Sequence, residues 1–202
     1  MSKLLAIGEA LIDFLPTENG KQIKDVISFE PKVGGAPANV CGVFSKMGDK
    51  GFLISKLGMD PFADKILDEF KSYNIQCDYI KQTDEANTSL AFVALKNDGD
   101  REFSFFRNPG ADMLLKEDEI EEKWFEDADI LHFCSVSLGE FPMKYAHKKA
   151  IEYAKKNGLL ISFDPNLRFP LWKDKELLRK TVREFIPMSH IVKISDEELE
   201  FI

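Results

Sequence analysis

The sequence predicts an α/β fold in which a mostly parallel sheet carries helices on both faces. Two observations support this fold class. Short apolar runs alternate along the chain with helix-length amphipathic segments, which is the pattern of repeated strand-helix units. The 202 residues are 44% hydrophobic and 31% charged, an ordinary globular composition, and a chain of this length can bury a substantial core. We therefore expect residues 1–202 to form a single α/β domain.

The strand and helix signals follow one another in order. In the first half, apolar runs predict strands over 4–8 and 51–57, and amphipathic periodicity predicts helices over 36–47 and 61–73. In the second half, we expect strands over 129–134, 159–164 and 190–194, helices over 142–156 and 174–185, and a helix start at 195–202. Asn157-Gly158 marks the end of the helix over 142–156.

Two segments break this alternation, over residues 10–33 and 88–107. Both show strand patterns without a helix between them, and the turn-forming "NDGD" at 97–100 joins the second pair of strands. We expect the two segments to form a small antiparallel flap attached to the main sheet. The acidic run "KEDEIEEKWFEDAD" at 116–129 is interpreted as the solvated face of a helix.

Charge and motifs argue against several classes of function. The net charge is -8, the pI is near 5.0 and the basic residues form no stripe, so no nucleic-acid partner is expected. The phosphate-binding loop, the dinucleotide fingerprint, the zinc-protease motif and the nucleophile elbow are all absent from the sequence. The histidines and cysteines are interpreted as structural: His132, His147, His190, Cys41, Cys77 and Cys134.

The same inspection bears on the compartment. The N-terminus does not resemble a secretory signal, and no run of about 18 apolar residues occurs, so neither secretion nor a membrane span is expected. Scattered cysteines without a pairing pattern favour reduced thiols, and hence a cytoplasmic protein.

The stretch "KVGGAPANV" at 32–40 places two glycines directly before a predicted helix start. Gly34 and Gly35 allow unusual dihedral angles and a close approach of a ligand, and Pro37 suits the first helical turn. Free backbone N–H groups at the start of this helix would point at a ligand, and the Asn39 side chain can both donate to and accept from a sugar hydroxyl. A tight strand-to-helix connection without any ligand fits the same residues equally well.

The chain also resembles a known family in five stretches: "GEALIDFLP", "GGAPANVCGVFSKMG", "TSLAFVALKNDGDREFSFFRNPGADMLL", "ISFDPNLR" and "VKISDEELEFI". Together they resemble the PfkB-type (ribokinase-like) carbohydrate kinases, closest to the fructokinases. The resemblance implies a ribokinase-like α/β fold with a β lid, and phosphoryl transfer from ATP to a sugar hydroxyl, with D-fructose giving fructose 6-phosphate. It also implies Mg²⁺, leaves K⁺ activation open, and implies a homodimer formed through the lid.

The resemblance assigns roles to individual positions. Those expected to contact the sugar are Asp13, Gly34, Gly35, Asn39, Phe105, Arg107 and Arg168. Those expected on the nucleotide side are Asn166, Lys193, Ser195 and Glu198, with Glu198 holding magnesium through water. Asn166 and Arg168 follow a predicted strand, where open α/β sheets bind ligands. Structural roles stay open for several of them: a turn for Asp13, an edge strand for "REFSFFR", a surface salt bridge for Arg168, and a capping box for Ser195 with Glu198.

One part of the family pattern is missing from this sequence. The family's catalytic aspartate lies in a later Gly-Ala-Gly-Asp loop, and "PGADML" at 109–114 does not match it, because this stretch lacks the second glycine and follows the lid arginine. We therefore expect the base to lie beyond Ile202, and this chain to correspond to the N-terminal two-thirds of a kinase and to be inactive alone. The alternatives are a 2-keto-3-deoxygluconate kinase and a non-catalytic sugar-binding relative.

Overall fold

In a computed structural model that describes residues 1–95 and 101–202, a parallel sheet forms the centre of the molecule. Within these residues the sheet has six strands in the order β10-β9-β8-β1-β4-β5. They are β1 (Lys3–Ile7), β4 (Lys50–Gly58), β5 (Ile80–Thr83), β8 (Ile130–Cys134), β9 (Leu160–Asp164) and β10 (Ile191–Val192). The prediction of a mostly parallel sheet is confirmed.

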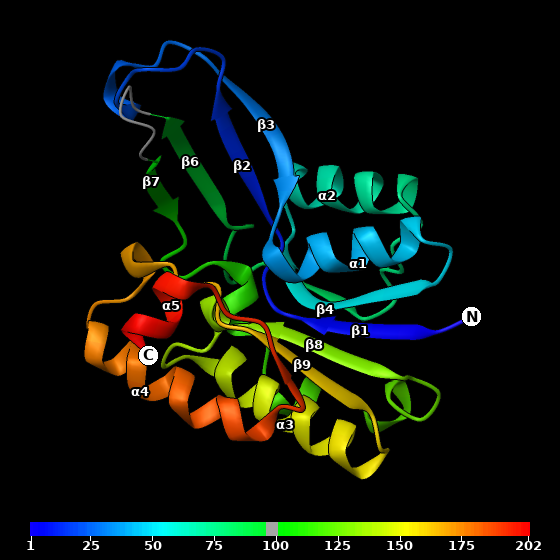
Figure 1. Cartoon of the computed structure of the whole chain (residues 1–202). Helices are drawn as coiled ribbons and strands as arrows, with labels where there is room; N and C mark the ends of the chain where they lie inside the picture. The colour runs from blue at the N-terminus through cyan, green and yellow to red at the C-terminus, as the bar shows by residue number, and fades with distance from the viewer. Residues whose placement is uncertain (96–100) are drawn as a thin grey trace.

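Helices cover both faces of this sheet (Figure 1). One face carries α1 (Ala36–Lys46) and α2 (Pro61–Ser72), and the other carries α3 (Pro142–Lys156), α4 (Lys175–Phe185) and the short α5 (Asp196–Phe201). Side chains along β1 alternate between the two layers, since Leu4 and Ala6 pack with one core cluster and Leu5 and Ile7 with the other. Burial on both faces explains why this strand is apolar from Leu4 to Ile7.

Aspartate side chains cap the starts of α2 and α4. The Asp60 carboxylate accepts the N–H groups of Phe62 and Ala63, each at 3.0 Å, and Asp174 accepts the N–H of Glu176 at 2.8 Å. The bounds predicted for α2 and α4 are confirmed to within one residue. The short 3-10 helices of the described residues are η1 (Ile23–Asp25), η2 (Ala111–Leu114), η3 (Glu117–Glu119), η4 (Glu122–Trp124), η5 (Ser135–Ser137), η6 (Phe169–Leu171) and η7 (Ile186–Met188).

Two details of the main sheet differ from the sequence analysis. The acidic run at 116–129 is not a solvated helix face: it forms the turns η3 and η4, and its Ile120, Trp124 and Phe125 are at most 4% exposed and belong to the core. The burial of the apolar side chains in that run determines its structure more than the solvation of its charged side chains does. Strand β5 was not predicted, because "IKQT" has no apolar run and is a strand only through its pairing with β4.

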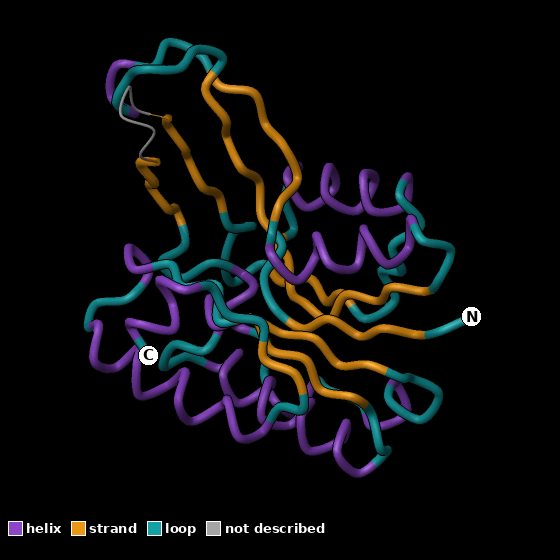
Figure 2. The backbone as a smooth tube through the Cα atoms, viewed as in Figure 1, coloured by secondary structure: helices purple, strands orange, loops and turns teal. Residues whose placement is uncertain are grey.

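The segments that break the alternation form a second sheet, the lid, which stands away from the main sheet (Figures 1 and 2). In its described part the order is β3-β2-β6-β7, with β2 (Leu11–Pro16), β3 (Phe29–Gly34), β6 (Leu90–Leu95) and β7 (Arg101–Phe106). Both hairpins are antiparallel, as predicted, but the central β2–β6 pair is parallel, so the expectation of a fully antiparallel flap was wrong. The predicted "NDGD" turn at 97–100 lies outside the described residues.

No helix in the described ranges combines the length and apolar character needed to cross a membrane.

His147 gives the core a pH dependence that can be measured. Its ring on α3 is 0% exposed, with Nδ1 2.7 Å from the Met143 carbonyl oxygen and Nε2 3.2 Å from that of Ile7. Burial lowers the pKa of His147 to about 4. In the unfolded chain the pKa of a histidine is about 6.5. Between about pH 6.5 and 4 the unfolded state therefore binds a proton that the folded state does not, so acidification favours the unfolded state. From pH 7 to pH 5 we expect His147 to remove about 2 kcal/mol of unfolding free energy, measured by urea denaturation.

The control for this prediction is His147→Gln. Burial raises the pKa of Glu9, so Glu9 works in the opposite direction, because there the folded state binds the proton more tightly. The difference between the native chain and His147→Gln therefore isolates the histidine. An equal pH dependence in the two proteins would contradict the prediction.

Candidate active site

A cavity of about 610 Å³ lies between the lid and the ends of the central strands. Its walls come from β2, β6 and β7 of the lid, from the start of α1, and from the segments that follow β8 and β9. Open α/β sheets bind ligands at the carboxyl ends of their strands, so this is the expected place for a site. Six of the residues predicted from the sequence line it: Asp13, Gly35, Asn39, Phe105, Asn166 and Arg168.

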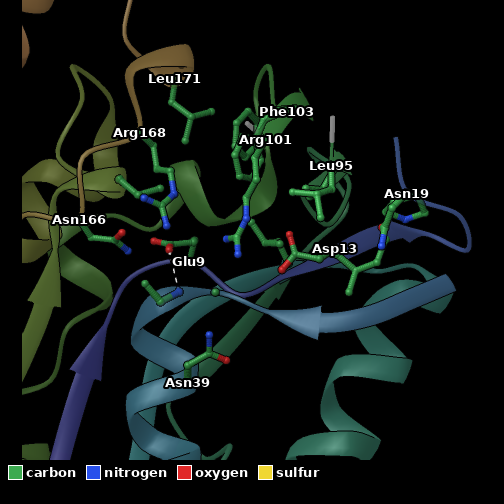
Figure 3. A pocket seen from close by; sticks show the side chains of 18 residues that line it. Glu9, Asp13, Asn19, Asn39, Leu95, Arg101, Phe103, Asn166, Arg168 and Leu171 are labelled. Atoms are coloured by element: carbon green, nitrogen blue, oxygen red, sulfur yellow. Dashed lines mark hydrogen bonds between the residues drawn. The ribbon is translucent and has the colours of Figure 1, made fainter. Parts of the chain in front are cut away.

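The lid contributes a partly aromatic wall. Alternate residues of β7 line the cavity, namely Arg101, Phe103 and Phe105, and the two phenylalanine rings stack with their centroids 5.7 Å apart. Figure 3 shows the Arg101 side chain extending into the cavity, toward the side that carries Glu9 and Asp13. The sequence analysis named only Phe105 of these three, although the period of two in "REFSFF" places Arg101 and Phe103 on the same face.

Asp13 is the half-buried carboxylate of the lid side of the cavity (Figure 3). Burial raises its pKa, and the positive charge of Arg168 opposes that shift. Gly34 does not line the cavity, but a Cβ added there would lie 2.0 Å from Oδ2 of Asp13. The glycine predicted as a sugar contact therefore acts by leaving room for the Asp13 carboxylate.

The start of α1 is held by a buried carboxylate that the sequence analysis missed. Gly35, with φ 116°, precedes the helix, and Oε1 of Glu9 accepts the N–H of Ala36 at 3.1 Å (dashed line in Figure 3). The expected set of free N–H groups is therefore corrected, because the first of them already has an acceptor within the protein. Glu9 is 3% exposed, and its burial raises its pKa while Arg107 opposes the shift. Its charge within the apolar N-terminal run was the available signal.

Arg107 does not line the cavity, which differs from the expectation that it covers the sugar. The side chain is buried behind the wall, where Nε donates to Oδ2 of Asp112 at 2.9 Å and Nη2 donates to the same carboxylate. Nη2 also donates to Oγ of Ser137 at 3.2 Å. Its contacts are therefore to protein groups, and no pattern in the sequence indicated Asp112 as the partner.

We expect Arg107→Ala to act mainly on stability. The substitution would leave the Asp112 carboxylate, 1% exposed, without its ionic partner, which costs about 3–5 kcal/mol of unfolding free energy. Arg168→Ala is the matched control, because Arg168 is half-buried and makes its side-chain hydrogen bond only to the neighbouring Leu167 carbonyl, among the described contacts. It should cost less than about 1 kcal/mol. Equal urea midpoints for the two variants would contradict this interpretation.

The residues predicted on the nucleotide side separate into two groups. Asn166 lines the cavity (Figure 3), whereas Lys193, Ser195 and Glu198 do not. Nζ of Lys193 is exposed and lies 3.3 Å from Oδ2 of Asp164. The capping box is present: the N–H of Ser195 donates to Glu198 at 2.9 Å, and Oγ of Ser195 accepts the N–H of Glu198 at 3.3 Å.

Glu198 also ties α5 to the segment that carries Arg168. Its Oε1 accepts the N–H of Leu167 at 2.9 Å. Burial alone would raise the pKa of Glu198, but the N–H groups of Ser195 and Leu167 outweigh it and lower that pKa. Each oxygen is thus engaged with backbone, and the described residues hold no group of three His, Cys, Asp or Glu placed to bind a metal ion. These residues do not by themselves make a magnesium site.

Comparison with known proteins gives the family. The family model described as "pfkB family carbohydrate kinase" matches residues 1–202. The chain belongs to the pfkB carbohydrate kinase family. Among relatives in this family, "Probable fructokinase-4" of Arabidopsis thaliana is 42% identical over 201 residues, which are 100% of this chain and 62% of the relative. "Fructokinase-2" of Solanum lycopersicum is 41% identical over 98% of this chain and 61% of its own length.

Solved structures of pfkB-like kinases share the fold. An uncharacterized sugar kinase from Pyrococcus horikoshii, in complex with ATP, superposes with a TM-score of 0.91 at 36% identity, over 98% of this chain and 65% of that one. Fructokinase from Xylella fastidiosa gives 0.86 at 35% identity, over 98% of this chain and 61% of that one. The expected ribokinase-like architecture is confirmed. The chain spans about 60% of the length of the curated relatives it matches.

Proposed function

We propose that the protein phosphorylates a sugar hydroxyl with ATP, and that it converts D-fructose to fructose 6-phosphate. The observation that carries this proposal is the combination, in one cavity, of the Asp13 carboxylate and Asn39 amide with the aromatic wall of Phe103 and Phe105. A monosaccharide offers hydroxyls to the polar groups and an apolar C–H face to the rings. The names of the similar proteins, fructokinases from plants and bacteria, support fructose as the sugar.

Each lining residue has a role in this proposal. The ionised Asp13 carboxylate accepts hydrogen bonds from two sugar hydroxyls, and Asn39 donates to one oxygen while accepting from another. The Arg168 guanidinium, which points into the cavity in Figure 3, donates to sugar or phosphate oxygens. The lid rings exclude water from the sugar. We assign the general base to no residue between 1 and 202.

ATP is proposed to bind on the side of Asn166, Lys193, Ser195 and Glu198. The similar kinases from Pyrococcus horikoshii and Xylella fastidiosa were solved with ATP bound, which supports this assignment. Lys193 is exposed and can turn from Asp164 toward a phosphate as a point charge. Mg²⁺ is proposed to arrive with the ATP phosphates, since this ion commonly takes much of its coordination from phosphate and water, and Glu198 would meet it through water.

A specific observation favours a second candidate, a 2-keto-3-deoxygluconate kinase. Arg101 and Arg168 both reach into the cavity (Figure 3), and two guanidinium groups suit the carboxylate of a sugar acid. A third candidate is a sugar-binding relative that transfers no phosphate.

The deciding experiment is an ADP-release assay on the product of the complete open reading frame, with MgATP and either fructose, 2-keto-3-deoxygluconate, ribose or glucose. Selective turnover of fructose supports the first proposal, and selective turnover of the sugar acid supports the second. Fructose binding without turnover supports the third, and neither binding nor turnover overturns all three. Repeating the assay with and without K⁺ tests activation by that ion.

A matched pair of variants tests the site in the same assay. Asn39→Ala should lower kcat/KM for the preferred sugar. The expected decrease corresponds to a loss of about 1–3 kcal/mol of transition-state stabilisation. Asn157→Ala serves as the control, because Asn157 caps the far end of α3 and does not line the cavity.

The lid has an aromatic outer face that could join two copies of the chain. We propose that the protein forms a homodimer through the outer face of the lid, where Phe14, Phe29 and Phe106 pack around Phe92 and Phe106 is 62% exposed. Sedimentation of Phe106→Ser as a monomer, beside a dimeric native protein, would support this.

We also propose a cytoplasmic location, since Cys41, Cys77 and Cys134 are free thiols.

A further inference from the structure

The chain passes between the main sheet and the lid at four places in the described residues. Residues 8–10 lead from β1 to β2, and Gly35 leads from β3 to α1. Residues 84–89 lead from β5 to β6, and residues 107–110 lead from β7 to η2. The orientation of the lid over the cavity depends on these four crossings, because the lid has its own sheet and shares no strand pairing with the main sheet among the described residues.

Hydrogen bonds to two buried carboxylates, Glu9 and Asp112, connect the crossings in pairs. Oε1 of Glu9, in the first crossing, accepts the N–H of Ala36, directly after the second, at 3.1 Å. At the other two crossings, Asp112 accepts from both Arg107, which donates through Nε at 2.9 Å, and Ser89, whose Oγ donates at 2.5 Å. Each pair is therefore fastened by one carboxylate.

Ser137 joins the two pairs. Its Oγ donates to Oε2 of Glu9 at 3.0 Å and accepts from Nη2 of Arg107 at 3.2 Å, which uses a hydroxyl as both donor and acceptor. Ser137 lies in η5, after β8 of the main sheet, so the joined crossings are also attached to the α/β body. The five side chains, Glu9, Ser89, Arg107, Asp112 and Ser137, are each 8% exposed or less.

We propose that Glu9, Arg107 and Ser137 are positioning residues that fix the lid over the cavity by tying its four crossings to the body. Glu9 lines the cavity beside the start of α1, whereas Arg107 and Ser137 act from behind its wall. A fully satisfied buried network of this kind has one preferred geometry, because any shift of a crossing leaves a buried polar group without a partner. The effect of this tie on sugar binding rests on the proposed function, but its effect on the lid does not.

Spin-label distances test the tie directly on the 202-residue chain. One label is attached through Ile27→Cys, at the lid end of the molecule, and the other through Met47→Cys, after α1. The native side chains at these positions are 86% and 76% exposed. Both labels are placed in a Cys77→Ser background, while Cys41 and Cys134 are buried and stay unlabelled. The native network should give one narrow distance distribution. Ser137→Ala should broaden that distribution at least about two-fold, because the hydroxyl that joins the two pairs is lost.

Ser55→Ala is the matched control. Ser55 is also 0% exposed and its Oγ has no hydrogen-bond partner among residues 1–95 and 101–202, so its loss should leave the distribution narrow. A distribution for Ser137→Ala that matches the Ser55→Ala control would overturn the proposal. If Ser137→Ala does not fold, Glu9→Gln decides in the same way, since it keeps a side chain of the same size and removes the charge.

Fructose titration by calorimetry separates this proposal from the proposed function. A Kd raised about ten-fold in Ser137→Ala, with Ser55→Ala unchanged, would support the role in sugar binding. Absence of fructose binding by the native chain would count against the proposed function, while the distance distributions would still decide whether the tie fixes the lid.

Discussion

Gly35→Ala is expected to lower the unfolding free energy by about 3–5 kcal/mol, a large effect for a single methyl group. Two causes combine at this position. With φ at 116° the backbone adopts a conformation that side chains rarely allow, and the added Cβ would lie 2.4 Å from the Glu9 carbonyl oxygen. That oxygen belongs to the backbone of the first lid crossing and cannot move without displacing it. Urea denaturation of the variant measures the loss.

Gly48→Ala is the matched control for this substitution. Gly48 also has a positive φ, 96°, but apart from its own chain neighbours no described residue has an atom within 4 Å of the place its Cβ would take. Only the backbone strain remains there, which costs about 1–2 kcal/mol. If both alanine variants lose the same free energy, the contact between Gly35 and Glu9 does not constrain the site.

Asp13→Asn is expected to weaken fructose binding by about 10- to 100-fold, the loss of hydrogen bonds to a charged acceptor worth about 1.5–3 kcal/mol. Asparagine keeps the size of the side chain and removes its charge, so the fold should persist. Calorimetric titration of fructose at neutral pH measures the change. Asp25→Asn is the control, because Asp25 is an exposed carboxylate of the same lid and does not line the cavity.

The pH dependence of binding gives a second test of Asp13. Burial raises its pKa above the ordinary aspartate value of 3.8, despite the opposing charge of Arg168. As pH falls toward that raised pKa, protonation removes the charged acceptor, so fructose affinity should fall in the native chain. Asp13→Asn should show no such fall. A parallel decline in both proteins would assign the titration to another group.

The main sheet could be predicted from the sequence because each of its longer strands is apolar enough to be recognised alone. Leu4 to Ile7 are buried on both faces, which leaves an uninterrupted apolar run as a local signal, and in β8 only His132 interrupts the buried apolar residues Leu131, Phe133 and Cys134. The parallel pairing of β2 with β6 has no such signal, since it depends on where two distant hairpins meet. The strand β5 has none either.

The candidate site also contains residues that could be predicted from the sequence and residues that could not. Asp13, Gly35, Asn39 and Asn166 lie in recognisable motifs, and the structure brings all four to one cavity. The burial of Arg107 could not be predicted, because the groups that hold it come from Asp112 and from Ser137, which follows another strand. Family resemblance assigns positions in a motif, whereas hydrogen bonds between distant crossings appear only once the chain is folded.

The parallel pair at the centre of the lid has a consequence for the order of folding. Each lid hairpin is a local structure, but the pair β2–β6 joins Ile12 to Leu90, so it closes a loop that contains α1, β4, α2 and β5. The entropic cost of closing that loop is smaller once these elements have packed against β1, because the free length of chain between the two strands is shorter. We therefore expect lid amides to gain protection from hydrogen exchange after those of β1 and β4 during refolding, a delay that pulse labelling would detect. The cavity would then form only after β1 and β4 have paired, so the site would be assembled on a sheet that is already in place.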